Sequence, residues 1–456
     1  MGVGLKGLLA GVAALVLLCV PAAAAADNWL PHPDDATWTW SWSDAVYATT
    51  PTAEKITVQN PKGGGSSFAL AWTTADLSNP DGAVSSAGTV SFQETNAGLV
   101  NTDWSSTPPP PQFPVLCAQA SSCGNALSSV LYNLIWGSRQ PLLAEPLVKG
   151  ASWASTGGAA NDVSSISTYR GQESVVVPAF PDGVTAAKVE TKITQAGALG
   201  DPYGSGTRTV WWVYGVGPVK IEFDHAGGTG ADITTAALQS TSLTALGAPN
   251  DADYFPLVKD STMTFRWTNP KHLRKPEVDQ FVVDAVVNGT ARLKLQSASG
   301  PVKAAGTYGF SKRLDGVTNL WGTTSSTGTA KFPPLGPAGA SADHRNHFVT
   351  ALDLLTFGVN PILEAYPAVG DHWGTTRAGT DYRTYGVDGV TTITGTQRVK
   401  VPAGTFTALV VRSTLKQPGF PFGSGTRTCW FAPGKGLVKL VFAHRDGSVS
   451  TVERLK

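Results

Sequence analysis

One stretch of this 456-residue chain occurs twice, and this repetition limits what the chain can fold into. Residues 203–225 read YGSGTRTVWWVYGVGPVKIEFDH and residues 422–444 read FGSGTRTCWFAPGKGLVKLVFAH, with 13 of the 23 aligned positions identical. Similarity at a fixed offset marks a duplicated structural unit. A second pair of segments, 29–44 and 254–269, aligns without gaps in the same order. The sequence therefore predicts two homologous units in tandem, each of ordinary domain size.

The repeated stretch has the pattern of a β-hairpin. In the first copy, Val219, Ile221 and Phe223 alternate with charged residues, which is the period of two expected for a strand with one buried face. Two glycines precede this strand and supply the positive φ angles of a tight turn. On the same parity, His225 and its counterpart His444 fall on the apolar face.

Composition favours β structure in both units. Only 15% of the residues are charged, whereas 50 glycines and 31 prolines are spread along the chain, a profile typical of many short strands joined by turns. Each unit also has one segment with apolar residues at helical spacing, at 126–136 and about 344–357. We therefore expect a mainly β protein in which each unit is a curved antiparallel sheet, or half-barrel, wrapped on one main helix.

The first 26 residues have the pattern of a secretory signal peptide, with Lys6, an apolar run and three alanines that end at Ala26. We expect cleavage near Ala26 and export of the mature chain. No transmembrane segment is expected there, because no later apolar run approaches the ~18 residues of a membrane span. The predicted organisation is a first unit at 27–247, a linker at 248–253 and a second unit at 254–456.

The second unit carries motifs that resemble those of a known family. Its segments YFPL (254–257), VPAGTF (401–406) and TCWFAPGKGLVK (428–439) are similar to YYPL, VPAGTF and YYAPGVGLVK in exported bacterial lipoproteins and envelope proteins of unknown function. The first unit matches less well, because its VPAF (177–180) lacks the Gly-Thr insertion. The resemblance implies a curved antiparallel sheet wrapped on a helix, akin to the open half-barrels of periplasmic lipid carriers. It implies no catalytic residue.

Catalytic and metal-binding motifs such as G-x-S-x-G, H-E-x-x-H and C-x-x-C do not occur in the sequence. His344 and His347 are the candidates for a metal site, although a solvated helix end is the simpler interpretation. Cys117 and Cys123 lie close together in a loop of an exported chain, which predicts a disulfide. Cys429 is expected to be buried with a free thiol. We expect no cofactor.

Eight residues are candidates for ligand contact. The aromatic face of each opening strand either packs in the core or forms an apolar platform for a lipid or a sugar ring. The hairpin arginines either line a cleft or lie on the surface, and the hairpin histidines are more simply core residues than catalysts. The candidates are Trp38, Trp40, Trp42, Trp267, Arg208, Arg427, His225 and His444.

Charge is distributed unevenly along the chain. Residues 27–250 contain 9 Lys and Arg against 18 Asp and Glu, and residues 251–456 contain 24 against 15, which gives net charges of −9 and +9. Opposed charges favour docking of the two units on each other. A basic unit equally suits an anionic cell-wall polymer as a partner. Nucleic acid is not expected as a partner of an exported chain with an acidic half.

The sequence predicts a secreted, non-catalytic protein that binds an apolar or amphiphilic, lipid-like ligand at the bacterial cell envelope. One alternative is an envelope structural or adhesion module without a small ligand. Another is a hydrolase that uses histidine and carboxylates. An elongated cavity would support the first function, a solid core with charged outer faces the second, and His and Asp clustered in one cleft the third.

Overall fold

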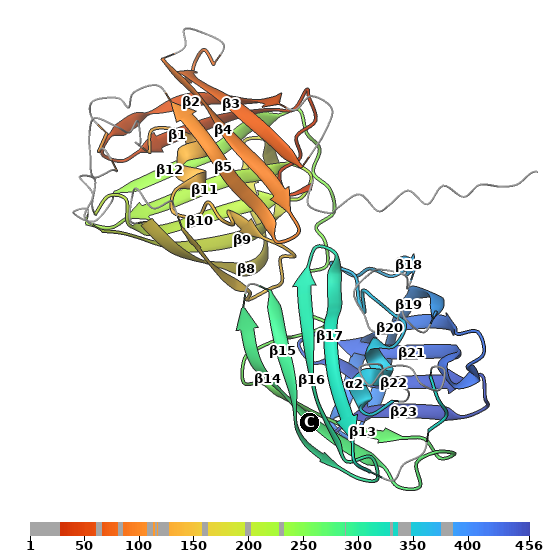
Figure 1. Ribbon diagram of the computed structural model, residues 1–456. Helices are drawn as coiled ribbons and strands as arrows, with labels where there is room; N and C mark the ends of the chain where they lie inside the picture. The colour runs from red at the N-terminus through yellow and green to blue at the C-terminus, as the bar shows by residue number, and fades with distance from the viewer. Residues whose placement is uncertain are drawn as a thin grey trace, which may run out of the picture.

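The computed structural model describes two antiparallel sheets, one from each half of the chain (Figure 1). The prediction of a mainly β protein is confirmed. We call the first sheet with its short helix the first unit, and the second sheet with its short helix the second unit. The described residues are 28–60, 66–80, 85–106, 113–114, 116, 127–156, 163–196, 202–227, 232–287, 289–328, 332–335, 348–374 and 386–456.

The first sheet has 12 strands within the described residues, in the order β6-β5-β4-β3-β2-β1-β12-β11-β10-β9-β8-β7. All of its strand pairs are antiparallel, and it curves into a nearly closed sheet (Figure 1). Its strands are β1 (Thr37–Asp44), β2 (Ala48–Asn60), β3 (Ser67–Asp76), β4 (Ser86–Thr95), β5 (Gly98–Ser106), β6 (Leu143–Ala144), β7 (Ser152–Thr156), β8 (Val163–Val177), β9 (Phe180–Gln195), β10 (Gly206–Val213), β11 (Gly217–His225) and β12 (Ile233–Thr241).

The second sheet repeats this topology with 11 strands in the described residues, in the order β17-β16-β15-β14-β13-β23-β22-β21-β20-β19-β18. In both sheets the first strand of the unit pairs with the last one, so that the middle of each sheet joins the two ends of the unit. The strands are β13 (Thr262–Thr268), β14 (Glu277–Val287), β15 (Thr290–Ser299), β16 (Ala304–Arg313), β17 (Gly316–Ser326), β18 (His372–Gly374), β19 (Asp388–Val401), β20 (Gly404–Lys416), β21 (Gly425–Ala432), β22 (Gly436–His444) and β23 (Val449–Arg454).

The two predicted hairpins are confirmed. Strands β10 and β11 pair from Gly206 opposite His225, and β21 and β22 pair from Gly425 opposite His444. The glycine at the start of each hairpin has a positive φ and touches the facing strand, where a Cβ would lie 2.1 Å from a backbone oxygen. This close approach explains why both copies have glycine at this position, since any larger residue would separate the strands.

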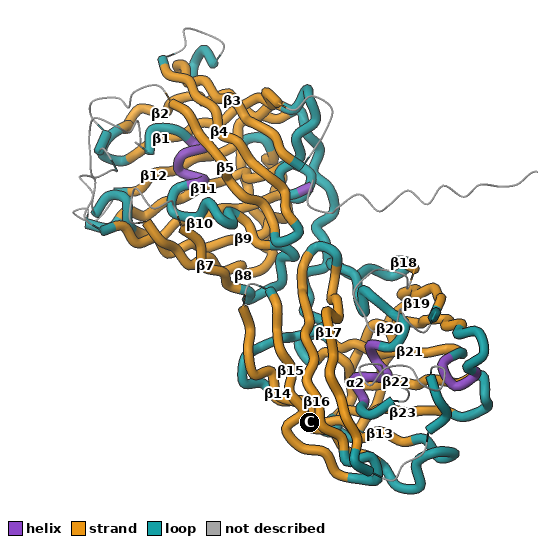
Figure 2. The backbone as a smooth tube through the Cα atoms, in the orientation of Figure 1, coloured by secondary structure: helices purple, strands orange, loops and turns teal. Residues whose placement is uncertain are grey.

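The prediction of one main helix in each unit is wrong. Within the described residues, α1 spans Val130–Ile135 and α2 spans Ala351–Thr356, each 6 residues long, and η4 (Pro421–Gly423) is a single 3-10 turn. Figure 2 shows how little of the backbone is helical. The apolar spacing predicted a helix that is too long, because it also includes buried residues outside the helix, such as Leu127. A helix of one to two turns is not stable alone, so α1 and α2 depend on contacts with the sheets.

The core of each unit lies between the sheet and its short helix. All six residues of α1 and all six of α2 are buried. Each helix belongs to the same hydrophobic cluster as the buried faces of the surrounding strands. The short helix therefore occupies the side of the curved sheet that an enclosed ligand would need.

Candidate functional site

Each buried helix is held at its N-terminus by a carboxylate from the second strand of its unit. In the first unit, Glu54 accepts hydrogen bonds from the backbone N–H groups of Val130 (2.8 Å) and Leu131 (3.4 Å). In the second unit, Asp279 accepts one from the N–H of Ala351 at 2.8 Å. These are helix N–H groups that lack an intrahelical partner, so the buried carboxyl oxygens satisfy donors that would otherwise be unpaired.

Each helix is held at its C-terminus by an arginine from the predicted hairpin. Arg208 donates to the carbonyl oxygens of Asn133 (2.6 Å) and Trp136 (2.7 Å), and its other terminal nitrogen bonds the hydroxyl of Ser138. Arg427 donates to Leu354 O (2.7 Å) and Phe357 O (2.8 Å). A guanidinium is suited to this role because its planar fork offers several donors in fixed directions.

These contacts answer the question that the sequence left open for the arginines. Arg208 and Arg427 are both 1% exposed, so they neither lie on the surface nor line an open cleft. They stand at equivalent positions of the repeat, as Glu54 and Asp279 do at an offset of 225 residues. In each unit, an acid therefore binds the N-terminus of the short helix and an arginine binds its C-terminus. We call these pairs, Glu54 with Arg208 and Asp279 with Arg427, the helix clamp.

Burial changes the ionisation of the clamp residues. It raises the pKa of Glu54 to about 8 and that of Asp279 to about 8, against the opposing effect of their backbone hydrogen bonds. It lowers the pKa of Arg208 to about 9. Shifted pKa values are common at catalytic sites, but structural groups show them too. Here the groups bond to backbone atoms inside the core, so the clamp holds the helix in place.

His225 lies in a buried network at the end of the first sheet. Its Nδ1 is 2.8 Å from the carbonyl oxygen of Tyr203, and its Nε2 is 2.8 Å from the hydroxyl of Thr234. The same hydroxyl lies 2.7 Å from Asp44 Oδ2, which also accepts a hydrogen bond from the phenol of Tyr203 at 3.0 Å. Burial lowers the pKa of His225 to about 4. With a neutral ring, Nδ1–H donates to the carbonyl, and Nε2 competes with Asp44 for the single hydroxyl proton of Thr234.

The second unit does not have this competition, because an asparagine stands where the first unit has Asp44. His444 Nδ1 is 2.6 Å from the carbonyl oxygen of Phe422, and Nε2 is 2.8 Å from the hydroxyl of Ser450. Asn269, at the position of Asp44, donates from Nδ2 to the same hydroxyl at 3.0 Å. The serine proton is then free for the neutral His444 ring, whose pKa burial lowers to about 4. Both histidines are buried and bonded to the core.

The aromatic candidates lie in the core. Trp38, Trp40 and Trp42 are 2%, 1% and 4% exposed, and Trp267 is fully buried. The indole N–H of Trp38 donates to Val216 O at 2.7 Å, which ties β1 to the turn before β11. These tryptophans therefore do not form an exposed platform. Trp38 and Trp40 line a cavity of about 10 Å³ with residues of α1, which is the room of one water molecule.

Several predicted residues fall outside the described part of the chain. These are Cys117 and Cys123, with their predicted disulfide, and the metal candidates His344 and His347. Cys429 is buried with a free thiol, and burial raises its pKa to about 11. Among the described residues, no group of three His, Cys, Asp or Glu could hold a metal ion. The helices within these residues also lack the length and apolar character needed to cross a bilayer.

A tyrosine from the second unit reaches into the first. The phenol oxygen of Tyr366 accepts hydrogen bonds from Leu147 N (2.7 Å) and Trp29 Nε1 (3.2 Å), and its hydroxyl lies 3.4 Å from Glu145 Oε2. Tyr366 packs against the hydrophobic cluster of the first unit and has a φ of 50°, which is uncommon for a residue with a side chain. Its ring thus contacts the first unit although the residue belongs to the second.

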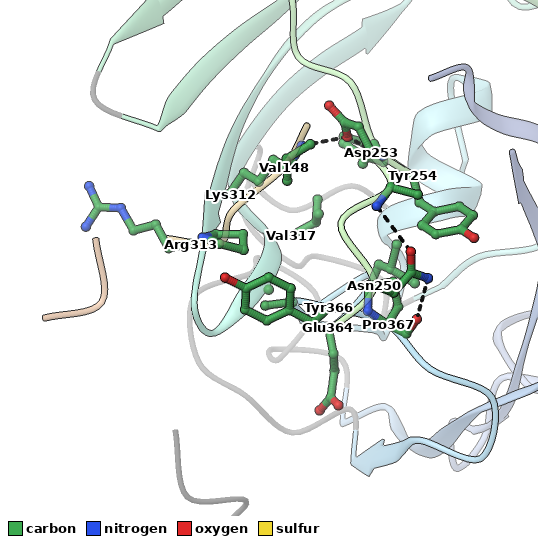
Figure 3. Close-up of a pocket in the computed structure, with 16 residues that line it drawn as sticks. Val148, Asn250, Asp253, Tyr254, Lys312, Arg313, Val317, Glu364, Tyr366 and Pro367 are labelled. Carbon is green, nitrogen blue, oxygen red and sulfur yellow. Dashed lines mark hydrogen bonds and ion pairs between the residues drawn. The ribbon is translucent and has the colours of Figure 1, made fainter. Parts of the chain in front are cut away.

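Beside Tyr366 lies a small cavity between the units (Figure 3). Its volume is about 30 Å³, and its walls include Val148 from the first unit, Asn250 from the connecting segment and Lys312 from the second unit. Asn250 Nδ2 donates to Pro367 O at 3.1 Å, and Lys312 Nζ is 2.6 Å from Asp253 Oδ1. The cavity has room for one or two waters and not for a larger ligand.

Sequence reasoning did not identify Glu54, Asp279 or Tyr366. For the two carboxylates a signal existed, because they recur at the same offset as the opening strands, in segments that are otherwise unlike. An acid kept inside an alternating strand pattern is a reason to expect a buried partner. Tyr366 gave no such signal, because the matching region of the first unit has no counterpart with this contact.

Two solved structures are distantly similar to about half of this chain. One is a Bacteroides fragilis protein assigned as exported, with a YmcC-like fold; it is 12% identical over 48% of this chain and 100% of its own, with a TM-score of 0.28. The other is a protein of Parabacteroides distasonis assigned as a lipoprotein; it is 11% identical over 47% of this chain and 98% of its own, with a TM-score of 0.26. No protein-family profile matches the chain, and no curated protein matches its sequence.

Proposed function

We propose that the protein is an exported, non-catalytic module of the bacterial cell envelope that attaches through its outer surface to an anionic polymer. The observation that carries this proposal is the filled interior of the first sheet, as its described residues show it. Tryptophans and α1 leave a cavity of about 10 Å³ there. Sites for small organic ligands usually have volumes of about 300–1,000 Å³.

Charge supports an anionic partner. The second half of the chain carries 24 Lys and Arg against 15 Asp and Glu. Its Asp279 is buried, so it contributes nothing to the outer surface, whereas basic residues such as Arg274, Lys275 and Arg445 are exposed. An excess of positive charge on the surface raises the local concentration of polyanions and speeds their association.

The arrangement of the histidines argues against a hydrolase. His225 and His444 are 4% and 5% exposed, and both ring nitrogens of each histidine have partners within the core. A general base needs to reach the proton that it removes from a substrate or a water molecule. The buried clamp carboxylates bond to backbone N–H groups and are equally remote from solvent.

Two measurements on the purified mature chain test this function. Binding of a labelled linear polyanion at low salt should be measurable and should weaken steeply with salt, because binding releases counterions from the polyanion and added salt makes this release less favourable. Native mass spectrometry should find the chain without a bound lipid. A co-purified lipid would restore the amphiphilic ligand that the sequence favoured, and absence of polyanion binding would overturn the proposal.

A further inference from the structure

The geometry points to one end of the second unit as the polymer contact, an inference that rests on the proposed function and gives it a location. The contact surface is formed by the β13–β14 loop and the two turns beside it. We call it the basic end and define it by five exposed residues, Lys271, Arg274, Lys275, Lys303 and Arg445. We propose that it binds a linear polymer with closely spaced anionic groups.

Hydrogen bonds bring these three segments together. Lys271 Nζ, in the β13–β14 loop, donates to the backbone oxygen of Asp446 at 2.8 Å, which places Arg445 of the β22–β23 turn beside this loop. Glu277, the first residue of β14, accepts a hydrogen bond from Val302 N at 2.9 Å. The β15–β16 turn, which includes Lys303, therefore lies at the same end of the sheet.

Few negative charges offset this cluster. Asp446 is already engaged by Lys271 (3.3 Å) and His272 (3.2 Å). Glu277 is fully buried and bonded to backbone N–H groups. Arg274, Lys275 and Arg445 form no ion pair with a carboxylate of the described residues. Their charges are therefore available to a partner.

The same end of the first unit has the opposite character. There β1 ends at Asp44 and β2 begins at Ala48, so the loop between them has three residues, 45–47. In the second unit the equivalent loop runs from Asn269 to Pro276 and contains the sequence KHLRK. The neighbouring acids of the first unit are Asp224 and Asp232. The two hairpins have the same number of residues between equivalent pairs, Trp42 with Thr52 and Trp267 with Glu277. The difference is one of sequence, because residues 45–51 read AVYATTP without a charge, whereas residues 270–276 read PKHLRKP. This end is therefore acidic in the first unit and basic in the second.

The basic end also points away from the acidic first unit. The β16–β17 turn lies at the opposite end of the strands, since β16 runs antiparallel to β15 from Ala304 to Arg313. That turn contacts the first unit, where Leu314 N donates to Asn96 O at 3.2 Å and Asp315 N to Asn96 Oδ1 at 3.0 Å (Figure 1). A polymer at the basic end is therefore kept apart from the net charge of −9 on the first unit.

The test compares two triple variants of the full mature chain. Arg274→Gln, Lys275→Gln and Arg445→Gln together remove three charges from the basic end and keep Lys271, which bonds the β22–β23 turn. The matched control is Arg398→Gln with Lys400→Gln and Arg412→Gln, three exposed residues of β19 and β20. The probe is fluorescently labelled inorganic polyphosphate, followed by anisotropy at about 20 mM salt, where screening is weak.

We expect the basic-end variant to bind polyphosphate roughly 100-fold more weakly, at about fivefold for each charge removed next to an anionic surface. Its slope of log affinity against log salt should fall by about 2, which is ~0.7 for each lost contact. The control variant has the same net charge and should lose less than about threefold. Thermal melts of both variants check that they are folded.

The outcomes separate this inference from the proposed function. Equal losses in the two variants would overturn the basic end as the contact and leave polyanion binding intact. No binding of polyphosphate by the unaltered chain would overturn both. Binding to vesicles rich in anionic lipid without binding to polyphosphate would also overturn the inference, because the partner would then be a membrane surface.

Discussion

Replacing Arg427 by methionine tests whether the helix clamp stabilises the second unit. Arg427 is 1% exposed and donates to Leu354 O and Phe357 O at 2.7 and 2.8 Å. Both oxygens lie at the end of α2, where the carbonyl groups have no intrahelical donor. Methionine keeps an unbranched apolar side chain of similar reach, so the substitution Arg427→Met removes the donors and the charge and little of the packing.

The loss follows from the two carbonyl groups. A buried polar group left without a partner costs about 1–3 kcal/mol, so two unpaired oxygens predict a loss of about 2–6 kcal/mol in the free energy of unfolding. Burying the guanidinium also costs free energy, and the variant avoids this cost. The expected loss of stability therefore lies in the lower half of this range. A domain is stable by only about 5–15 kcal/mol, so the second unit should be markedly weakened.

Urea unfolding and hydrogen exchange together measure this effect. Exchange at the amides of α2 reports the second unit, and exchange at α1 reports the first, whose protection should not change. The matched control is Arg412→Met on the adjacent strand, where Arg412 is exposed and pairs with Thr428. The control should stay within about 0.5 kcal/mol of the unaltered chain. If Arg427→Met and Arg412→Met have the same stability, the clamp interpretation is refuted.

Three further predictions concern buried groups. Burial raises the Glu54 pKa from its ordinary 4.5 to about 8, so the folded state keeps a proton that the unfolded chain loses, and stability should fall as pH rises across this range. Because Asp279 has a similarly raised pKa, Glu54→Gln should reduce this slope in urea titrations at several pH values without abolishing it, and an unchanged slope would be contrary evidence. Asp44→Asn deprives the Tyr203 phenol of its acceptor and should cost about 1–2 kcal/mol in urea unfolding. Adding Tyr203→Phe gives the first unit the same pair as Asn269 and Phe422 in the second, and should recover most of the lost stability. If the two substitutions instead lower the free energy of unfolding additively, Asp44 and Tyr203 are not coupled. Tyr366→Ala should separate the units and raise the radius of gyration in small-angle scattering; an unchanged radius would show that other contacts hold them.

The hairpins could be predicted because their signal is local. Alternation of Val219, Ile221 and Phe223 with charged residues specifies one buried face, and a strand needs only its own period of two to show it. The burial of His225 and His444 followed from the same parity. The antiparallel sheets followed from the turns between successive strands. These features depend on neighbours along the chain, and the sequence contains those neighbours.

The helices and the clamp could not be predicted in the same way. Spacing alone does not separate a helix from a buried loop, as the residues before Val130 show. Parity placed Arg208 on a face, but its partners are carbonyl groups 72 and 75 positions earlier. Likewise, Glu54 meets the N–H of Val130, 76 positions later.

The sequence by itself determined that two similar β units follow one another, with opposite net charges and buried histidines. Only the tertiary structure decided that each curved sheet closes on a single helical turn, that Glu54 and Arg208 bind its two ends, and that Tyr366 joins the units. The physical reason is that a buried charge is tolerated only where distant backbone groups satisfy it. Those distances are set by how the strands curve, which the order of residues along one strand does not show.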